Sequence, residues 1–485
     1  MTSTIKVNTV TTESGSILTL GESGKTVTLA SGASQSGFGR EGSVDWQTTP
    51  KTSTFTAVNG EGYFINASGS VTANLPAGSA GAIVAFSDYA RNFATYNLIV
   101  APNGSEKIGG QAQNAQLTVN GQSATFVYVD STKGWINVQN SEDTETGTTF
   151  ITASGGNSCG TDGNYKYHVF TGPGTFTVSG VSGDAPNNVV DYLVVGGGGG
   201  GGAGSTNWTQ GGGGGAGGYR TFVSNPTTSP KNAPAGITVT AQGYAVVVGG
   251  GGAGGTPPCS TGKGSSGDLS SALGISSAGG GGGGAYSIPN GQGAGSGASG
   301  GGGSNACTGP GTAGGAGNTP PVAPVQGNDG GDANRAFAGP TASTNMAGGG
   351  GGANACGGDG VGAGPVTPTA KGGDGGAGEP NYITGSNVTY AGGGGGGGAG
   401  VCSGNTPGYG GGGLGGAGGG GNAATGGRTL NCVTWTPGGT GQNGTDNTGG
   451  GGGGGGATGD NVTPEFGMGG GTGGSGIVII RYKYQ

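Results

Sequence analysis

Short runs of alternating apolar and polar residues recur in the first part of the chain. Between residues 41 and 140 these runs predict strands at 63–66, 71–75, 83–87, 97–100, 116–119, 125–129 and 135–138. Turn dipeptides such as Asn59-Gly60, Asn103-Gly104 and Asn120-Gly121 separate several of them. Short strands without a helical pattern predict a small β-sandwich or barrel over residues 41–140.

Two shorter segments flank this predicted domain. Residues 17–20 and 26–29 alternate at period two around Gly21-Glu-Ser-Gly24, which is typical of a hairpin. A segment as short as 1–40 cannot bury a core of its own. We therefore expect it to be an attachment or trimerisation segment whose partner strands come from identical chains. Residues 141–147 are acidic and are predicted to be a linker.

Alternation returns at both ends of a glycine-rich domain, which we place at 148–485. Runs at 165–170, 175–178 and 191–195 precede the glycine tracts, and residues 477–484 follow the last tract. We expect 148–195 and 476–485 to form a small β scaffold, in which the last strand closes the sheet begun by the first. Residues 196–475 would then leave this scaffold and return to it.

Glycine contributes 134 of the 485 residues, in uninterrupted runs such as 196–202, 279–284, 392–398 and 449–456. These runs have no side chains to bury, so they must be disordered or held by backbone hydrogen bonds. Collagen needs glycine at every third position, and an α-helix costs about 1 kcal/mol per glycine. The polyproline II conformation remains, in which every peptide group points outward and can bond a neighbouring strand. We predict a polyglycine II bundle, with mainly β modules before it and little or no α-helix.

Composition excludes several classes of protein. The formal net charge is −7 and no basic patch is visible, so we expect no nucleic-acid partner. No segment approaches 18 consecutive apolar residues, so no membrane insertion is expected. The N-terminus shows no signal-peptide pattern, which predicts synthesis in a cytoplasm without export by the usual route.

Cysteines occur only in the glycine-rich part, mostly in polar interruptions between tracts. None forms a C-x-x-C pair, which argues against zinc. The even number is compatible with disulfides of unknown pairing, and free thiols in a reducing cytoplasm are the alternative. The six are Cys159, Cys259, Cys307, Cys356, Cys402 and Cys432.

Candidate catalytic residues are few. His168 is the only histidine and lies in an alternating run, so a structural role is favoured over Ser-His-Asp chemistry. Asp329 with Asp332, or Asp359 with Asp374, could in principle form a glycosidase carboxylate pair, but their glycine-rich settings suggest turns. The G-x-G-x-x-G matches follow from glycine density alone. We expect no catalysis, no metal and no cofactor.

The interruptions between tracts differ from one another and are polar and proline-containing. Varied loops on a repetitive scaffold are typical of recognition proteins. Aromatic side chains near such loops suit contacts with sugars or polar surface epitopes, and anchoring the end of the bundle is the alternative. The candidate receptor-binding residues are Trp208, Tyr286, Tyr382, Tyr390 and Trp435.

Several segments resemble a known family. Residues 20–39, Gly62-Tyr-Phe-Ile-Asn66 and Gly134-Trp-Ile-Asn-Val138 are similar to segments of marine bacteriophage tail-fibre proteins. Residues 191–198 and 474–482 resemble the ends of the glycine-rich domain of phage fibres and adhesins. The resemblance implies a virion component, usually trimeric, whose N-terminal part lies nearer the tail and whose polyglycine II bundle presents receptor-binding loops.

These observations predict a homotrimeric phage tail-fibre adhesin, made in the host cytoplasm and located in the virion. It would contact other tail proteins at its N-terminal end and bind a host surface glycan or outer-membrane protein through loops between tracts. A fibre-borne polysaccharide depolymerase and a purely structural virion fibre are the alternatives. An ice-binding glycine protein is disfavoured, because strict Gly-X-X triplets are missing.

Overall fold

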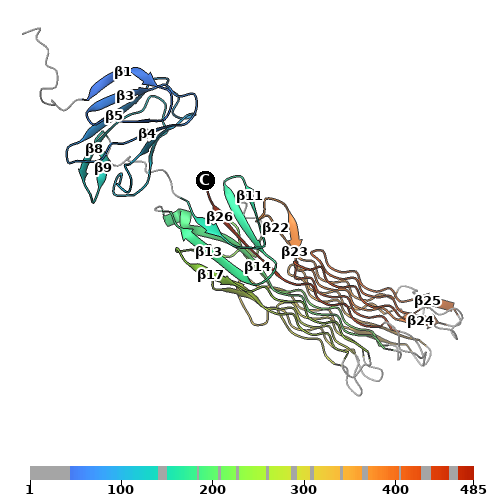
Figure 1. Cartoon of the computed structure of the whole chain (residues 1–485). Coiled ribbons are helices and arrows are strands. Elements are labelled where there is room, and N and C mark those ends of the chain that lie inside the picture. The colour runs from blue at the N-terminus through green and yellow to red at the C-terminus, as the bar shows by residue number, and fades with distance from the viewer. Residues whose placement is uncertain are drawn as a thin grey trace, which may run out of the picture. The chain divides into compact units, whose positions relative to one another are not determined.

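The chain folds into two compact units, Met1–Gly147 and Thr148–Gln485 (Figure 1). The computed structural model describes residues 44–139, 150–182, 185–205, 209–224, 229–257, 262–285, 292–305, 311–338, 342–362, 370–403, 406–427, 438–457 and 468–485. Side chains are described throughout these ranges except in 335–338, 342–345, 400–403 and 406–409. The predicted hairpin in 1–40 and the linker at 141–147 therefore lie outside the described residues. Each unit has hydrophobic clusters of its own.

In the first unit, the chain alternates between two sheets over a common core. The first sheet, in spatial order, holds β1 (Asp45–Lys51), β3 (Glu61–Ile65), β5 (Ile83–Asp88), β8 (Ser123–Asp130) and β9 (Gly134–Asn137). The second sheet holds β2 (Phe55–Thr56), β4 (Val71–Asn74), β6 (Leu98–Ala101) and β7 (Ala115–Leu117). Every strand predicted from alternation in this region is present. The sequence did not predict β1 and β2, nor the parallel pairing of β1, β3 and β5.

Aromatic side chains fill the space between these sheets. Phe86 and Phe126 contact edge to face, with ring centroids 6.1 Å apart. Trp135 is fully buried and donates its indole N–H to Glu106 Oε2 at 3.2 Å. Gly134 precedes it with a φ of 68°, and a Cβ there would overlap the carbonyl oxygen of Lys107, so only glycine fits this turn.

The second unit begins with a β scaffold whose closure was predicted correctly. One sheet holds, in spatial order, β11 (Ser158–Asp162), β12 (Tyr165–Phe170), β26 (Ile477–Lys483), β14 (Val189–Val195) and β15 (Tyr219–Phe222), and β16 (Ile237–Thr238) pairs with β14. A second sheet holds β10 (Thr152–Ser154), β13 (Gly174–Gly180) and β17 (Gly243–Val246). The C-terminal strand β26 is thus central in its sheet, between β12 and β14.

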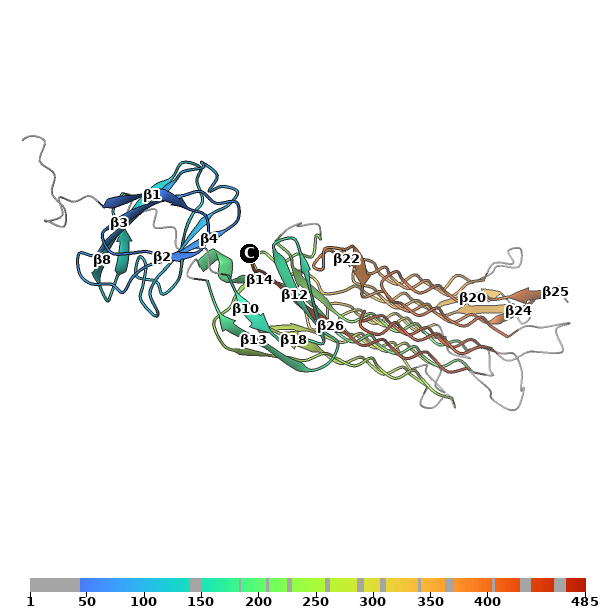
Figure 2. The same ribbon diagram turned by 45° about the horizontal axis from the view of Figure 1, so that its top comes forward.

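The glycine tracts leave this scaffold as extended segments that lie side by side, some parallel and some antiparallel (Figures 1 and 2). Along tract 196–204 successive N–H groups donate to three different neighbouring segments in turn, so the same segment accepts again at every third residue. A period of three is the period of the polyproline II helix, whereas a β ladder bonds neighbours at a period of two. For Gly199, Gly200 and Gly201 in turn, the acceptors are the carbonyls of Gly215, Ser265 and Gly471, at 2.8, 2.9 and 2.9 Å.

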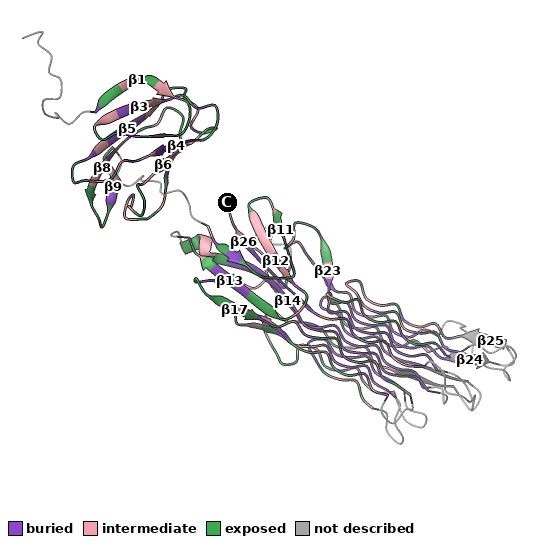
Figure 3. Ribbon diagram, viewed as in Figure 1, coloured by how far each residue is buried: buried purple, intermediate pink, exposed green. Residues whose placement is uncertain are grey.

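Backbone surrounds the inner tracts completely. The carbonyls of tract 196–204 accept N–H groups from three further tracts, 249–255, 280–284 and 452–455. A Cβ on Gly199 would overlap the carbonyl oxygen of Gly281, and one on Gly198 that of Gly450. Peptide groups therefore replace an apolar side-chain core, and glycine is a steric requirement at inner positions such as Gly198 and Gly199. Figure 3 shows this burial along the inner tracts.

Small hairpins cap both ends of the bundle. At the scaffold end lie β18 (Ser270–Ala272) with β19 (Ile275–Ser277) and β22 (Glu379–Asn381) with β23 (Val388–Tyr390). At the opposite end lie β20 (Asn334–Ala338) with β21 (Ala342–Met346) and β24 (Gly400–Ser403) with β25 (Thr406–Tyr409) (Figure 2). Helix is limited, in the part of the chain that the structure describes, to the 3-10 turn η1 (Ala185–Asn188). The predicted fold class is confirmed.

Candidate functional site

The end of the bundle away from the scaffold, here called the far end, is closed by side chains at the ends of the tracts. Ser205, Thr209, Gln210 and Asn305 are all buried there. The hydroxyls of Ser205 and Thr209 contact each other, and Ser205 N–H donates to the Thr209 carbonyl at 2.8 Å. The Asn305 amide donates to Gln210 Oε1 at 3.0 Å. These pairs fix where the chain leaves and re-enters the bundle.

A small apolar cluster lies at the same end. It consists of Met346, Ala370, Ala399 and Ala457, all buried. Ala457 donates its N–H to Gly398 at 3.0 Å, which joins two inner tracts at their ends. The far end is therefore a packed base, because buried apolar and polar side chains close the tract ends. The sequence did not predict which residues form this base, because a single alanine or serine at the end of a glycine run carries little signal.

Chain segments of differing sequence connect the tract ends at this base. Two of them are the hairpins β20–β21 and β24–β25 (Figure 2). Trp208, Tyr286 and Trp435 belong to connecting segments and lie outside the described residues, as do Cys259, Cys307 and Cys432. The residues that flank these three aromatic positions include Ser205, Thr209 and Ala285, which are buried at tract ends. The prediction of receptor contact through these aromatics stays a prediction.

Tyr382 and Tyr390 lie elsewhere, in the β22–β23 hairpin at the scaffold end. Tyr390 is 5% exposed within a core cluster that includes Leu193 and Ile479, and burial raises its pKa to about 12. Tyr382 is half-buried. The expectation of an exposed ring near a loop tip is therefore wrong for Tyr390. The alternative of anchoring the bundle's end fits its position, because β22 and β23 pair and dock on the scaffold.

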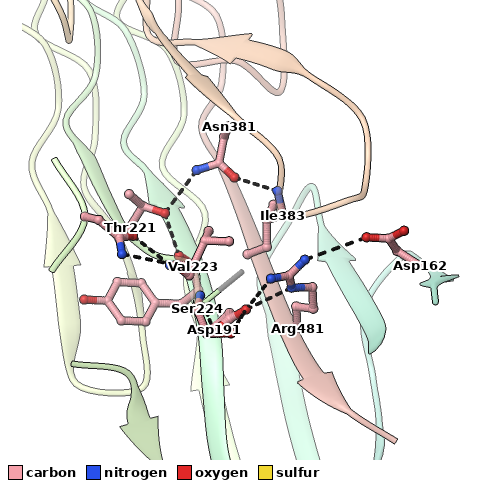
Figure 4. A network of polar contacts seen from close by, with 10 residues as sticks. Asp162, Asp191, Thr221, Val223, Ser224, Asn381, Ile383 and Arg481 are labelled. Atoms are coloured by element: carbon pink, nitrogen blue, oxygen red, sulfur yellow. Dashed lines mark hydrogen bonds and ion pairs between the residues drawn. The ribbon is translucent and has the colours of Figure 1, made fainter. Parts of the chain in front are cut away.

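Asn381 holds this hairpin in place (Figure 4). Its side-chain amide donates to Tyr219 Oη at 2.7 Å and to Thr221 Oγ1 at 3.0 Å, and its Oδ1 accepts the Ile383 N–H at 2.8 Å. Burial raises the pKa of Tyr219 well above its ordinary value. A neutral, fully bonded network thus attaches the hairpin to β15.

The predicted disulfide cysteines are only partly described. Cys159 and Cys356 are exposed and have free thiols, so neither is paired in this structure. Cys402 lies in β24, where only the backbone is described. Pairing among the remaining cysteines stays open.

The four aspartates considered for glycosidase chemistry are not in turns, contrary to the sequence interpretation. They lie on tracts at the surface of the bundle and accept backbone N–H groups of neighbouring tracts. Asp332 Oδ1 accepts Gly314 at 2.8 Å, and Asp359 Oδ1 accepts Asp332 at 2.8 Å. Asp329 accepts Gly317 at 2.6 Å and Asp374 accepts Leu414 at 2.7 Å.

Elsewhere on the bundle surface, asparagine side chains also accept backbone N–H groups of neighbouring tracts. Asn422 Oδ1 accepts Gly415 at 2.8 Å, and Asn443 Oδ1 accepts Thr472 at 3.0 Å. An outer tract has no neighbour on one side, so its outward N–H groups would otherwise bond only water. Asp and Asn side chains therefore terminate the lattice, in the way that charged residues protect the edge of a β-sheet.

His168 has the structural role favoured from the sequence. Its ring is buried, stacks on Tyr482 with centroids 5.7 Å apart and lies 2.6 Å from the Gly155 carbonyl through Nδ1. Nε2 lies 3.2 Å from Tyr482 Oη. Burial lowers the pKa of His168, so the neutral ring is favoured. Both ring nitrogens are thus engaged, by the Gly155 carbonyl and the Tyr482 hydroxyl.

Two other kinds of site are absent from the described residues. No group of three or more His, Cys, Asp or Glu side chains among them could hold a metal ion. No helix in those ranges is long and apolar enough to cross a membrane.

Comparison with known proteins identifies the second unit. The family model for the glycine-rich domain matches residues 171–483, which is more than half of the chain. The chain therefore belongs to the glycine-rich domain family. No curated protein matches the sequence.

Proposed function

We propose that this protein is a bacteriophage tail-fibre adhesin that binds a host surface receptor through the segments connecting its tracts at the far end. The single observation that carries the proposal is the packed base at that end. Buried residues such as Gln210 and Asn305 fix the tract ends, while the connecting sequences differ in length and in polar and aromatic content. A stiff scaffold with variable connections favours recognition, because little order must be gained when a partner binds.

The remaining parts of the proposal rest on the resemblance of the terminal segments. The protein would be a homotrimer in the virion, joined to other tail proteins through its N-terminal part. Its receptor would be a surface glycan or an outer-membrane protein. The proposed binding is without catalysis, and the four candidate aspartates then have a structural role, because each accepts a backbone N–H of a neighbouring tract.

Competition for adsorption tests this function. Purified full-length chain is added to host cells before the virus that carries it, and we expect adsorption to fall. A variant in which 428–437 is replaced by a Gly-Ser linker of equal length should compete less. The matched control changes the scaffold-end hairpin tip, Ser386→Gly with Asn387→Ser, and should compete like the natural chain. No competition by the natural chain, or equal loss in the control, would contradict the proposal.

A further inference from the structure

Asp88 is a buried carboxylate of the first unit, and the described residues supply no cation for it. It is the last residue of β5 and is 7% exposed. Its Oδ2 accepts the N–H groups of Phe93 and Gly121, at 3.2 and 2.9 Å. Arg91 lies on the same turn, but neither it nor another basic group of the described residues forms an ion pair with Asp88. Buried charges in proteins are generally paired or bound to a metal ion.

Two oxygen atoms of this turn are buried and accept no hydrogen bond from the described residues. They are Oδ1 of Asp88 and Oδ1 of Asn92. The Asn92 amide is held from its other side, because its Nδ2 donates to the Ala67 carbonyl at 2.7 Å. The carboxylate lies against the same turn, since the Phe93 N–H that it accepts follows Asn92 directly. Burying an acceptor without a partner is unfavourable, above all when it is charged. Both atoms therefore call for a ligand from outside the described residues.

Backbone carbonyls add further oxygen atoms around this turn. The Gln122 carbonyl accepts the Asp88 N–H at 3.0 Å, and the Ile65 carbonyl accepts the Tyr89 N–H at 3.0 Å. The Ala67 carbonyl comes from the loop after β3. A carbonyl oxygen has two lone pairs, so each of these can make a second interaction. Three loops thus meet around Asp88, and the groups that they bring are oxygen donors.

We propose that Asp88 and Asn92 bind a calcium ion. Carboxylate, amide and carbonyl oxygens together with water are the ligands that Ca²⁺ takes, in a flexible geometry, whereas zinc and softer metals take nitrogen and sulfur. A water molecule would hydrogen-bond the same oxygens but would leave the charge of Asp88 uncompensated. The site differs from a cluster of acidic side chains, because it contains one carboxylate. Its affinity is therefore weak, with a Kd of about 0.1–1 mM, as in extracellular calcium modules.

The test is calcium binding by the full-length chain, and it does not depend on receptor binding. Equilibrium dialysis against CaCl2 gives the calcium bound per chain. We expect the natural chain to bind one ion that Asp88→Asn loses, with an affinity at least about tenfold weaker in this variant, because a charged ligand is removed. Asp130→Asn is the matched control. Asp130 also accepts two backbone N–H groups, from Thr132 and Lys133, but it is exposed and should not affect binding.

Asn92→Asp tests the same site in the opposite direction. It keeps an oxygen at the site and adds a charge, so calcium should bind about tenfold more tightly. Without calcium, two buried carboxylates would repel each other, so thermal unfolding of this variant should depend more strongly on calcium than that of the natural chain. No calcium binding by the natural chain up to about 10 mM, ten times the weakest affinity expected, would overturn the proposal. Equal binding by Asp88→Asn, or an Asn92→Asp variant that calcium does not stabilise, would also overturn it.

Discussion

Arg481 in β26 and Asp191 in β14 form a buried ion pair although they are 290 residues apart in the sequence. Arg481 Nε and Nη2 donate to Asp191 Oδ2 at 2.9 and 2.6 Å, and Ser224 N–H donates to Asp191 Oδ1 at 3.0 Å (Figure 4). The pair joins the strand before the first tract to the strand after the last. All tracts are thereby enclosed between two bonded strands.

Removing one member of this pair should destabilise the second unit. Arg481→Met leaves the Asp191 carboxylate buried without its cation, which costs about 3–5 kcal/mol in comparable sites. Lys483→Met on the same strand is the control, because Lys483 is only half-buried and should cost less than about 1 kcal/mol. Denaturant unfolding followed by circular dichroism measures both. Equal effects of the two substitutions would show that the pair does not close the unit.

Glycine should be required where a Cβ would overlap a neighbouring carbonyl and dispensable where the space beside the backbone is open. Gly199→Ala places a methyl group on the Gly281 carbonyl, so tracts must separate and we expect a loss of at least about 1–3 kcal/mol. At Gly250 the only atom near a new Cβ is Asp268 Oδ2, at 3.4 Å. Gly250→Ala should leave the stability of the fold unchanged or raise it by up to about 1 kcal/mol, because alanine restricts the backbone of the unfolded chain more than glycine does. Thermal unfolding of the two variants compares them, and equal midpoints would contradict the packing.

The surface aspartates should act through their oxygen atoms and not through their charge. Asp332→Asn keeps an oxygen that can accept the Gly314 N–H, whereas Asp332→Ala removes it. We expect the alanine variant to lose about 0.5–1.5 kcal/mol and the asparagine variant to lose less. Hydrogen exchange at Gly314 would report the same difference locally. If both variants exchange alike, the side chain does not terminate the lattice there.

Acid should weaken the second unit through His168. Its pKa is below the ordinary 6.5 in the folded state because the ring is buried, so the unfolded chain binds the proton more readily. The unfolding free energy should therefore fall as the pH drops below about 6.5, down to the lower folded pKa. His168→Phe keeps a ring against Tyr482 and removes the only histidine, so this fall should vanish. An unchanged pH dependence in the variant would assign the effect to other groups.

The sequence predicted those structural elements that depend on a periodic pattern within one segment. Alternation located the strands from β3 to β9, and glycine runs located the tracts, because each pattern reflects a repeat within one segment. The acceptor role of Asp332 was not visible, since it depends on which tract lies beside it. The spacing of three residues between Asp329 and Asp332 did indicate that the two lie on the same side of a tract, because a polyglycine II helix repeats every three residues. Tyr390 was misplaced for the same reason: its burial comes from the docking of a hairpin on distant strands.

The lattice of peptide groups is the central claim, and hydrogen exchange along the outer tract 249–255 tests it most directly. The N–H groups of Gly249, Gly252 and Gly255 are bonded to Ser270, Gly198 and Gly201. We predict slow exchange at these three positions and fast exchange at the residues between them, a protection pattern with a period of three. Uniformly fast exchange, or protection that alternates with a period of two, would contradict the polyglycine II bundle.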